Sequence, residues 1–190
     1  MRNMVQSFHF EKLRLEGAWV IDPFIAYDER GYFIKDYSAE AFQRAGITHD
    51  LKEVFYTNSH KGVVRAIHFQ RVKQQPKLVR CVSGKVYDVI VDLRKNSPTF
   101  GQWEGFTLSE ENKKELLVPA GFGHGYLVLE PSIVSYKCAE RFYGEYDDGI
   151  FWNDPDLGIS WPTGLVDRII LSEKDQKLDS FAAFQERSGF

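Results

Sequence analysis

The sequence predicts an all-β protein, an antiparallel sandwich or jelly-roll barrel with a few short helices. About ten short apolar segments recur along the 190 residues, and turn-forming residues separate them. The 15 Phe, nine Tyr and four Trp residues suit packing on a pleated sheet. Because no internal repeat, low-complexity tract or linker interrupts this series, residues 1–190 are expected to form a single domain with a full core.

The first part of the chain is predicted to hold four strands and one helix. Gly17 interrupts the first strand and Asp22–Pro23 ends it, since both signals favour turns. Ser38 is a good N-cap for a helix over residues 39–44, and Gly46 is placed to close that helix. The predicted strands span residues 13–24, 31–36, 53–58 and 62–70.

The second part is predicted to continue with short strands and one helix start. Ser83–Gly84 separates two apolar runs by two residues, a spacing typical of a β-hairpin. Glu130–Pro131 is also predicted as a turn, and Ser172–Asp175 as the start of a short helix. The predicted strands span residues 78–82, 85–93, 103–108, 114–118, 125–129 and 133–139.

Composition and charge restrict the function classes. A formal net charge of -3 favours neither nucleic acid nor an anionic membrane as a partner. The chain has no signal-peptide core and no run of about eighteen apolar residues, so a cytoplasmic protein without a membrane span is expected. Cys81 and Cys138 form no metal-binding or disulfide framework; reduced thiols are the simplest expectation, and a single disulfide is also compatible.

Polar side chains interrupt the apolar pattern of the strand over residues 62–70 and of the strand that follows. These residues are Arg65, His68, Gln70 and Lys77. Strict alternation predicts Arg65 on one face and His68 with Gln70 on the other, and an antiparallel return would bring Lys77 near His68. Because buried polar groups need partners or a substrate, two interpretations stay open: a satisfied polar network or a catalytic site.

A Pro-x-Gly-x-x-His pattern lies between two predicted strands and is formed by Pro119, Gly121 and His124. This pattern resembles the second motif of cupin barrels, which implies a cupin-type jelly-roll barrel. Metal-binding cupins also carry a His-x-His motif, and the corresponding position here offers His68 without a second histidine. No metal and no other cofactor is therefore expected.

The chain as a whole resembles one metal-free cupin family, the dTDP-4-dehydrorhamnose 3,5-epimerases of nucleotide-sugar biosynthesis. The similarity follows the family order over roughly residues 13–178. Each motif alone is modest, and together they indicate the family. The matching segments are residues 28–33, 61–70, 77–80, 91–101, 119–126, 136–138, 152–159 and 171–175.

The resemblance implies a metal-independent epimerase that acts on a nucleotide-linked 4-keto-6-deoxy sugar. The carbonyl acidifies the hydrogens on C3 and C5, and inversion needs a base on one face and an acid on the other. By resemblance His68 is the base, oriented by Asp175, and Lys77 offsets the charge that develops on O4. Tyr136 is the acid, since a phenol with an ordinary pKa of about 10 suits that role. Without the resemblance, Tyr136 would be interpreted as a core aromatic and Asp175 as a first-turn helix residue.

The same resemblance implies a set of substrate-binding residues. Arg65 corresponds to an arginine that contacts the diphosphate. Arg30 and Phe33 correspond to residues that reach the nucleotide from the neighbouring subunit, so a homodimer with shared sites is expected. Phe142 corresponds to an aromatic residue that stacks on the nucleotide, and His124 to a histidine of the same pocket. The further binding candidates are Lys35, Asn58 and Gln70.

Several nucleotide-facing positions depart from the family pattern. Lys35 stands where Glu is typical, which replaces a hydrogen-bond acceptor with a donor. The loop over residues 55–61 is shorter than usual and lacks a Gln, Ala66 replaces a common Gly, and Arg141 replaces one of two tyrosines. Sugars linked to dTDP, CDP or GDP therefore stay open as substrates.

Two other function classes also stay open. A 3,4-ketoisomerase on the same barrel would move the carbonyl instead of inverting carbon, and a non-catalytic sugar-binding cupin would need no acid–base set. Retention of that set, formed by His68, Lys77, Tyr136 and Asp175, favours epimerisation. Inversion at C3, at C5 or at both carbons is compatible with these residues.

Overall fold

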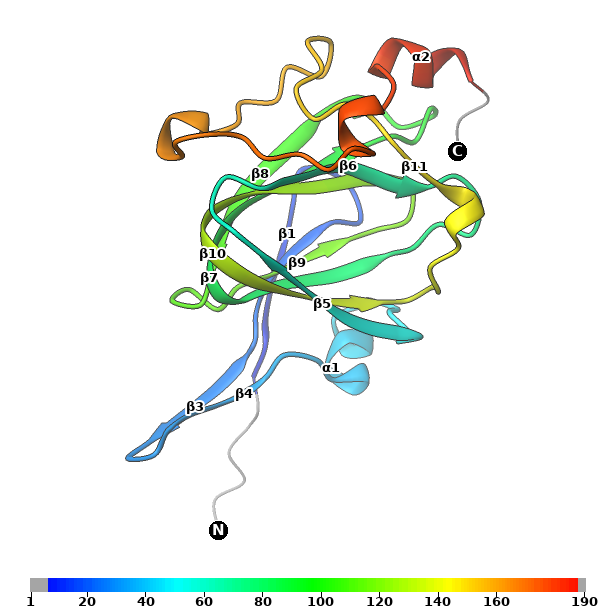
Figure 1. The fold of residues 1–190 in the computed structure, drawn as a ribbon. Helices are drawn as coiled ribbons and strands as arrows, with labels where there is room; N and C mark the ends of the chain where they lie inside the picture. Colours follow the sequence, from blue (N-terminus) through cyan, green and yellow to red (C-terminus); the bar gives the residue numbers. More distant parts are fainter. Residues whose placement is uncertain (1–6, 188–190) are drawn as a thin grey trace.

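A computed structural model describes residues 7–187, and antiparallel strands dominate this part of the chain (Figure 1). The predicted all-β jelly-roll class is confirmed, with two small α-helices in the described residues. The strands are β1 (His9–Lys12), β2 (Trp19–Asp22), β3 (Phe24–Asp28), β4 (Gly31–Lys35), β5 (Glu53–Ser59), β6 (Val64–Gln70), β7 (Lys77–Asp92), β8 (Trp103–Ser109), β9 (Glu115–Val118), β10 (Phe122–Cys138) and β11 (Asp147–Gly149). The helices are α1 (Ala39–Arg44) and α2 (Phe181–Glu186), and the 3-10 turns are η1 (Gly144–Tyr146), η2 (Thr163–Leu165) and η3 (Asp175–Lys177).

Two long strands, β7 and β10, pair with each other along their length and contribute to both walls of the barrel (Figure 1). The first half of β10 also pairs with β6, and its second half pairs with β5. The first half of β7 pairs with β9, and its second half pairs with β8. The predicted hairpin at Ser83–Gly84 and the predicted turn at Glu130–Pro131 are therefore wrong, because both segments lie inside continuous strands.

The two irregular segments face each other, which explains why the strands bend there and do not reverse. Gly84 adopts a φ of +78°, and a Cβ at this position would lie 2.1 Å from the carbonyl oxygen of Pro131. The Ser132 hydroxyl accepts from the Lys85 amide at 3.0 Å and donates to the Lys85 carbonyl at 3.1 Å. The common two-residue hairpin turn needs positive φ at both central residues, and Ser83 does not have it. The glycine that suggested a turn instead lies at a β-bulge, opposite a second irregular segment in β10.

The N-terminal strand boundaries also differ from the prediction. Within the predicted strand over 13–24, residues 19–22 form β2, and residues 13–18 form a tight loop around Gly17, at φ +90°, which joins β2 to the preceding strand β1. The strand ends at Asp22–Pro23 as predicted, and β3 begins directly after Pro23 in a separate two-stranded sheet with β4. The helix prediction is confirmed, because Ser38 Oγ accepts from the Ala41 amide at the start of α1. The short polar strand β11 and helix α2 were not predicted.

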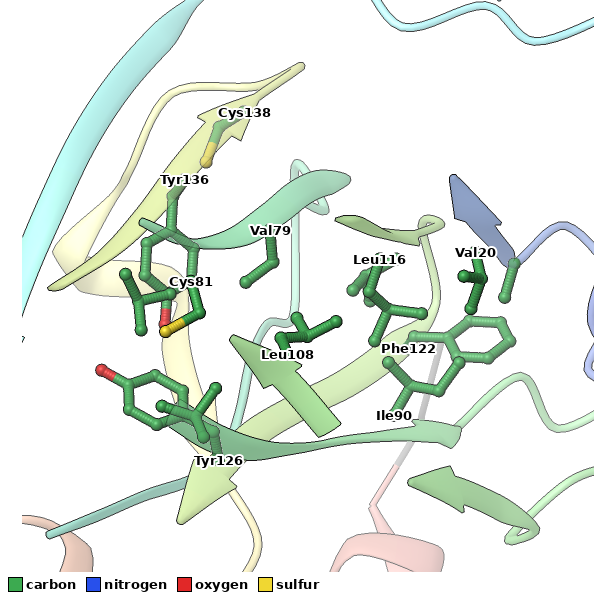
Figure 2. Packing of buried hydrophobic residues seen from close by; sticks show 14 of the residues in the cluster. Val20, Val79, Cys81, Ile90, Leu108, Leu116, Phe122, Tyr126, Tyr136 and Cys138 are labelled. Carbon is green, nitrogen blue, oxygen red and sulfur yellow. The ribbon is translucent and has the colours of Figure 1, made fainter. Parts of the chain in front are cut away.

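Three apolar clusters fix the walls of the barrel. The interior cluster lies between the two walls and includes Val79, Leu108, Tyr126 and Tyr136 (Figure 2). A second cluster covers the outer face of β6 and its neighbours with the C-terminal segment over residues 150–184 (Figure 1). A third cluster buries the inner side of α1 against β2 and β9. Polar side chains on the inner faces of β6, β7 and β10 are thus placed inside the barrel.

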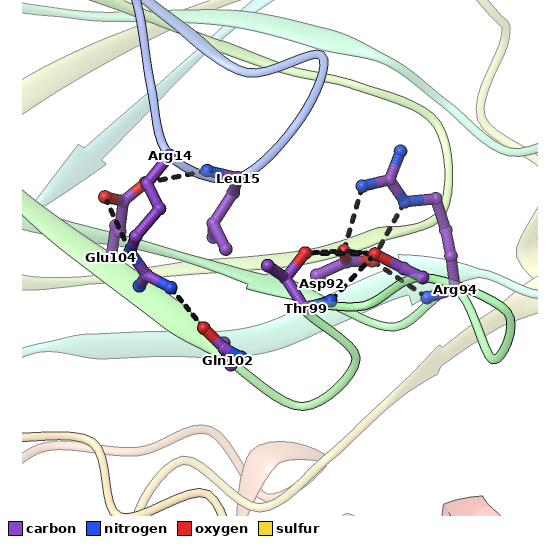
Figure 3. A network of polar contacts seen from close by, with 8 residues as sticks. Arg14, Leu15, Asp92, Arg94, Thr99, Gln102 and Glu104 are labelled. Carbon is purple, nitrogen blue, oxygen red and sulfur yellow. Dashed lines mark hydrogen bonds and ion pairs between the residues drawn. The ribbon is translucent and has the colours of Figure 1, made fainter.

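The connection after β7 is held by a buried carboxylate. Asp92 accepts from the Arg94 guanidinium at 2.8 and 2.9 Å and from the hydroxyls of Ser97 and Thr99 (Figure 3). Burial alone would raise the pKa of Asp92, but these hydrogen bonds lower it to about 2. Arg14, which contacts both Gln102 and Glu104, ties the N-terminal loop to the same region (Figure 3).

Replacement of Asp92 by asparagine is expected to lower the free energy of unfolding by about 2 kcal/mol near neutral pH. The sign follows from the depressed pKa: the stabilisation is present above the ordinary value of 3.8 and is lost as pH falls through about 2. Chemical denaturation at pH 7 and at pH 2 measures the difference. The exposed Asp167→Asn variant is the control, and a pH-independent difference for Asp92→Asn would contradict this account.

Candidate active site

The inner face of β6 carries Arg65, His68 and Gln70 together, which differs from the predicted split. Ala66 and Ile67 are adjacent and both fully buried in the outer cluster, so the alternation changes phase between them. The peptide bond that joins them is cis. Arg65 Nε donates to Ser59 Oγ at 3.1 Å. Its positive charge opposes the rise in the pKa of the Tyr136 phenol, which lies inside the barrel. Strict alternation therefore placed Arg65 on the wrong face.

Strand order also differs from the prediction that β6 and the Lys77 strand are neighbours. β10 lies between β6 and β7, so His68 pairs with His124 across the β6–β10 ladder. Lys77 begins β7 opposite Cys138. It nevertheless lines a small pocket together with Gln70 and Phe122. Lys77 thus lies beside Gln70 at the end of β6, without direct pairing of the two strands.

His68 and Asp175 form a close pair although 107 positions separate them in the chain. His68 Nε2 lies 2.7 Å from Asp175 Oδ1. The aspartate side chain is 4% exposed, whereas the imidazole is 33% exposed. The Ser172 hydroxyl accepts from the Asp175 amide at 3.0 Å and fixes the turn that carries the carboxylate. The arrangement holds one imidazole nitrogen and leaves the ring partly open to the barrel interior.

Tyr136 lies on the inner face of β10 and is 6% exposed. Its ring stacks on Phe55 of β5 at a centroid distance of 4.7 Å, and the His124 ring meets it edge-on at 5.8 Å. Burial, followed by the nearby Tyr126 and Asp88, raises the pKa of Tyr136 well above its ordinary value. The phenol is therefore held protonated at neutral pH.

Two further polar pairs lie beside Tyr136. His124 Nε2 lies 2.8 Å from Asp88 Oδ1, and both side chains are buried. Burial raises the pKa of Asp88, while the charge and hydrogen bond of His124 oppose this shift. Tyr126, which is fully buried, shares a 2.8 Å hydrogen bond with Thr57 Oγ1 on β5.

Lys77 and Gln70 differ in what their polar groups contact. The Lys77 ammonium donates to the Gln75 carbonyl at 3.1 Å, and burial lowers the pKa of Lys77. Gln70 is buried, and its amide nitrogen donates to the carbonyls of Lys73 and Arg141. Its amide oxygen accepts from the Tyr143 amide at 2.6 Å. Gln70 thus holds the backbone on both sides of Phe142.

Three predicted binding residues lie on the β3–β4 hairpin, which projects away from the barrel (Figure 1). Arg30 lies at its tip in an exposed ion pair with Asp28, and Phe33 is 57% exposed. Lys35 lies at its base, next to Asp36, which accepts from the Lys137 ammonium at 2.7 Å. Within one chain the hairpin residues are not brought to the His68–Asp175 pair.

Asn58 and Phe142 lie at the rim of this arrangement. Phe55, Thr57 and Ser59 contact barrel residues from the inner face of β5, so the alternating Asn58 faces the opposite side and is exposed. Phe142 is 55% exposed, and its amide donates to Glu53 Oε2.

Sequence reasoning missed Asp88, Tyr126 and Thr57. A signal existed for Asp88, because a lone carboxylate inside a buried apolar strand needs a partner. Tyr126 and Thr57 resemble ordinary strand residues, and only the three-dimensional fold brings their hydroxyls together in the 2.8 Å hydrogen bond inside the barrel.

The sequence model of the dTDP-4-dehydrorhamnose 3,5-epimerase family matches residues 12–183. The chain belongs to this family. It is accordingly an isomerase of the carbohydrate epimerase type, as the sequence predicted. The match contains every strand from β2 to β11 and the Asp175 turn, so all the residues described above lie inside it.

Individual members of the family are similar over nearly the whole chain. The dTDP-4-dehydrorhamnose 3,5-epimerase of Methanothermobacter thermautotrophicus is 49% identical over 171 residues, which cover 90% of this chain and 92% of that protein. A Legionella pneumophila epimerase, solved in complex with dTDP-4-keto-L-rhamnose, is 38% identical with a TM-score of 0.88 and coverage of 92% and 93%. A Bacillus anthracis dTDP-4-dehydrorhamnose 3,5-epimerase, solved with TDP and PPi bound, is 40% identical with a TM-score of 0.87 and coverage of 92% and 99%.

Two further features of residues 7–187 bear on earlier expectations. None of their helices is long and apolar enough to cross a bilayer. Cys81 and Cys138 are both buried free thiols.

Proposed function

We propose that the protein is a metal-independent epimerase that inverts C3 and C5 of a dTDP-linked 4-keto-6-deoxy sugar. The observation that carries the proposal is the 2.7 Å pair of His68 and Asp175, which opens into the same barrel interior that holds the buried Tyr136 phenol. The dTDP group is favoured over CDP and GDP because the similar Legionella and Bacillus proteins were solved with dTDP-4-keto-L-rhamnose and with TDP and PPi.

In this proposal His68 removes the proton next to the C4 carbonyl. Asp175 holds the ring orientation and stabilises the imidazolium that forms. The electrons move to O4, where Lys77 offsets the negative charge of the enolate. Tyr136 then delivers its proton to the opposite face of the same carbon, which completes the inversion. The sequence repeats at the second carbon.

Binding is assigned to the residues around this interior. Arg65 contacts the diphosphate, and its hydrogen bond to Ser59 orients the guanidinium plane. His124, in contact with both Tyr136 and Asp88, lines the sugar side of the site. Phe142 stacks on the nucleotide base, and Gln70 acts through the backbone segment that it holds. Asn58 and Lys35 are assigned to the outer part of the nucleotide site.

Deuterium wash-in tests this function. The dTDP-4-keto-6-deoxyglucose substrate is incubated with the protein in D₂O and followed by NMR, with the CDP- and GDP-linked sugars as parallel arms. Deuterium at C3 and C5 together with inverted product is expected for the dTDP sugar. Transfer of the carbonyl to C3 would indicate a ketoisomerase, and absence of label with all three nucleotides would indicate a binding protein.

The protein is further proposed to be a homodimer in which the β3–β4 hairpin completes the partner's site. Support comes from the β3–β4 hairpin, which projects away from its own barrel (Figure 1) and carries the exposed side chains of Arg30 and Phe33. Mixing an Arg30→Ala subunit with a His68→Ala subunit is expected to restore about a quarter of the wild-type activity, since about half of the dimers are mixed and each holds one intact site.

Subunit exchange is verified by native mass spectrometry in the same samples. The matched control mixes His68→Ala with Asp175→Asn, because both changes lie in the barrel and no mixed dimer then holds an intact site. Exchange without recovery in the Arg30 mixture would place each complete site within one chain.

A further inference from the structure

The proposed reaction leaves a buried acid that must regain its proton after every inversion. His68 gains a proton and Tyr136 loses one, so both groups must be reset. The imidazole is 33% exposed and can release its proton to water directly. Tyr136 is 6% exposed beneath the Phe55 ring and lies among apolar side chains. A phenolate in that position is costly, and it needs a route to a proton source.

Two hydroxyl groups provide such a route. Tyr126 lies on the same strand and the same inner face as Tyr136, and Figure 2 shows both phenols in one cluster. The Tyr136 hydroxyl points toward Tyr126 in Figure 2, and the nearby Tyr126 phenol contributes to the raised pKa of Tyr136. The Tyr126 hydroxyl shares a 2.8 Å hydrogen bond with Thr57 Oγ1. Each hydroxyl can donate one hydrogen bond and accept another, which proton transfer along a chain requires.

Thr57 connects this chain to solvent. Tyr126 is fully buried, whereas Thr57 is half-buried on β5, opposite Val134 of β10. The order from Tyr136 through Tyr126 to Thr57 therefore runs from the buried interior toward solvent.

We propose that Tyr126 and Thr57 form a proton relay that returns a proton to Tyr136 after each inversion. The proposal rests on the proposed acid role of Tyr136. The Tyr126 O–H bond breaks as a new O–H bond forms on the Tyr136 phenolate, and Tyr126 takes the Thr57 proton. Thr57 takes a proton from a water molecule, and the hydroxide formed is neutralised by the proton that His68 releases. No net charge or oxidation change remains.

The Tyr126→Phe variant tests the relay, because it removes one hydroxyl and keeps the buried ring. The first inversion needs no reset, since Tyr136 starts protonated. Rapid-quench measurement with enzyme in excess is therefore expected to give the wild-type rate for the first inversion, whereas the second inversion on the same sugar already waits for the reset. With substrate in excess, we expect a burst of one inversion event per site followed by steady turnover slowed by about 10²-fold, with KM falling together with kcat because the slow step follows the first inversion.

Thr57→Val is the second relay variant and is expected to give the same burst with a smaller loss. Tyr87→Phe is the matched control, since its phenol lies against the outer cluster, and it should turn over like the wild type. A Tyr126→Phe protein that slows the first inversion as much as steady turnover would overturn the relay and assign Tyr126 a positioning role. Unchanged steady turnover would overturn it in favour of another proton source such as His124.

Failure of the relay and failure of the proposed function give different results. If Tyr136 is not the acid, the Tyr136→Phe variant inverts as well as the wild type in a single turnover. If only the relay is wrong, Tyr136→Phe still loses inversion while Tyr126→Phe shows no burst.

Discussion

Replacing His68 with alanine is expected to remove nearly all exchange of the C3 and C5 hydrogens with D₂O. The imidazole is the one group in the proposed site that pairs with a buried carboxylate and is itself partly open to the barrel interior. Loss of a positioned general base lowers rates by about 10²–10⁴-fold. NMR integration of the sugar resonances against time measures the loss at each carbon separately.

The fold is expected to survive this change, since a half-exposed imidazole is removed and the apolar clusters stay intact. Thermal unfolding of the variant checks this, and His60→Ala, an exposed histidine near the start of β6, is the matched control. Asp175→Asn should show a smaller loss than His68→Ala, because the ring stays present but loses its charged partner. Substantial exchange by His68→Ala would mean that another residue is the base.

Tyr136→Phe is expected to separate exchange from inversion. The variant keeps the ring that stacks on Phe55 and loses only the hydroxyl. His68 can still remove a proton and return a deuteron to the same face, so label enters the sugar without a change in configuration. Inverted product should fall by about 10²–10⁴-fold while exchange continues.

The configuration of the sugar and its deuterium content must be measured in the same sample. Coupling constants report the configuration at C3 and C5, and the loss of proton signal reports exchange. Tyr87→Phe serves as the control for removal of a tyrosine hydroxyl from the sheet. Inversion by Tyr136→Phe at the wild-type rate would make this tyrosine a core aromatic and remove the support for inversion at both centres.

The fold class and most strand positions follow from apolar periodicity and turn residues, but turn signals alone do not distinguish a reversal from a bulge. Gly84 supplies the positive φ that either structure requires. The outcome depends on Pro131 and Ser132 of β10, which lie opposite Gly84 across the ladder. A long-range partner therefore decides whether the chain turns or bends, and a local reading of the sequence has no access to it.

The candidate site, like the fold, could be predicted from the sequence only in part. The alternation of side chains is broken between Ala66 and Ile67, which both face the outer apolar cluster. The face on which Arg65 lies could therefore be assigned only from the structure. Asp175 was identified through the family resemblance, because nothing local marks a turn residue as the partner of a distant histidine. The sequence shows which residue types can act as acids, bases or phosphate ligands. Which of them become neighbours in space depends on strand order.

The C-terminal segment has a consequence for how the enzyme is made. It is synthesised after every strand of the barrel, yet it supplies both Asp175 and the apolar side chains that cover the outer face of β6. A chain still attached to the ribosome without this segment has His68 but lacks its carboxylate, and it exposes an uncovered apolar wall of the kind that chaperones bind. With Asp175 in its proposed role, activity and solubility both depend on this one segment, so a chain truncated before it is expected to be inactive and prone to aggregate.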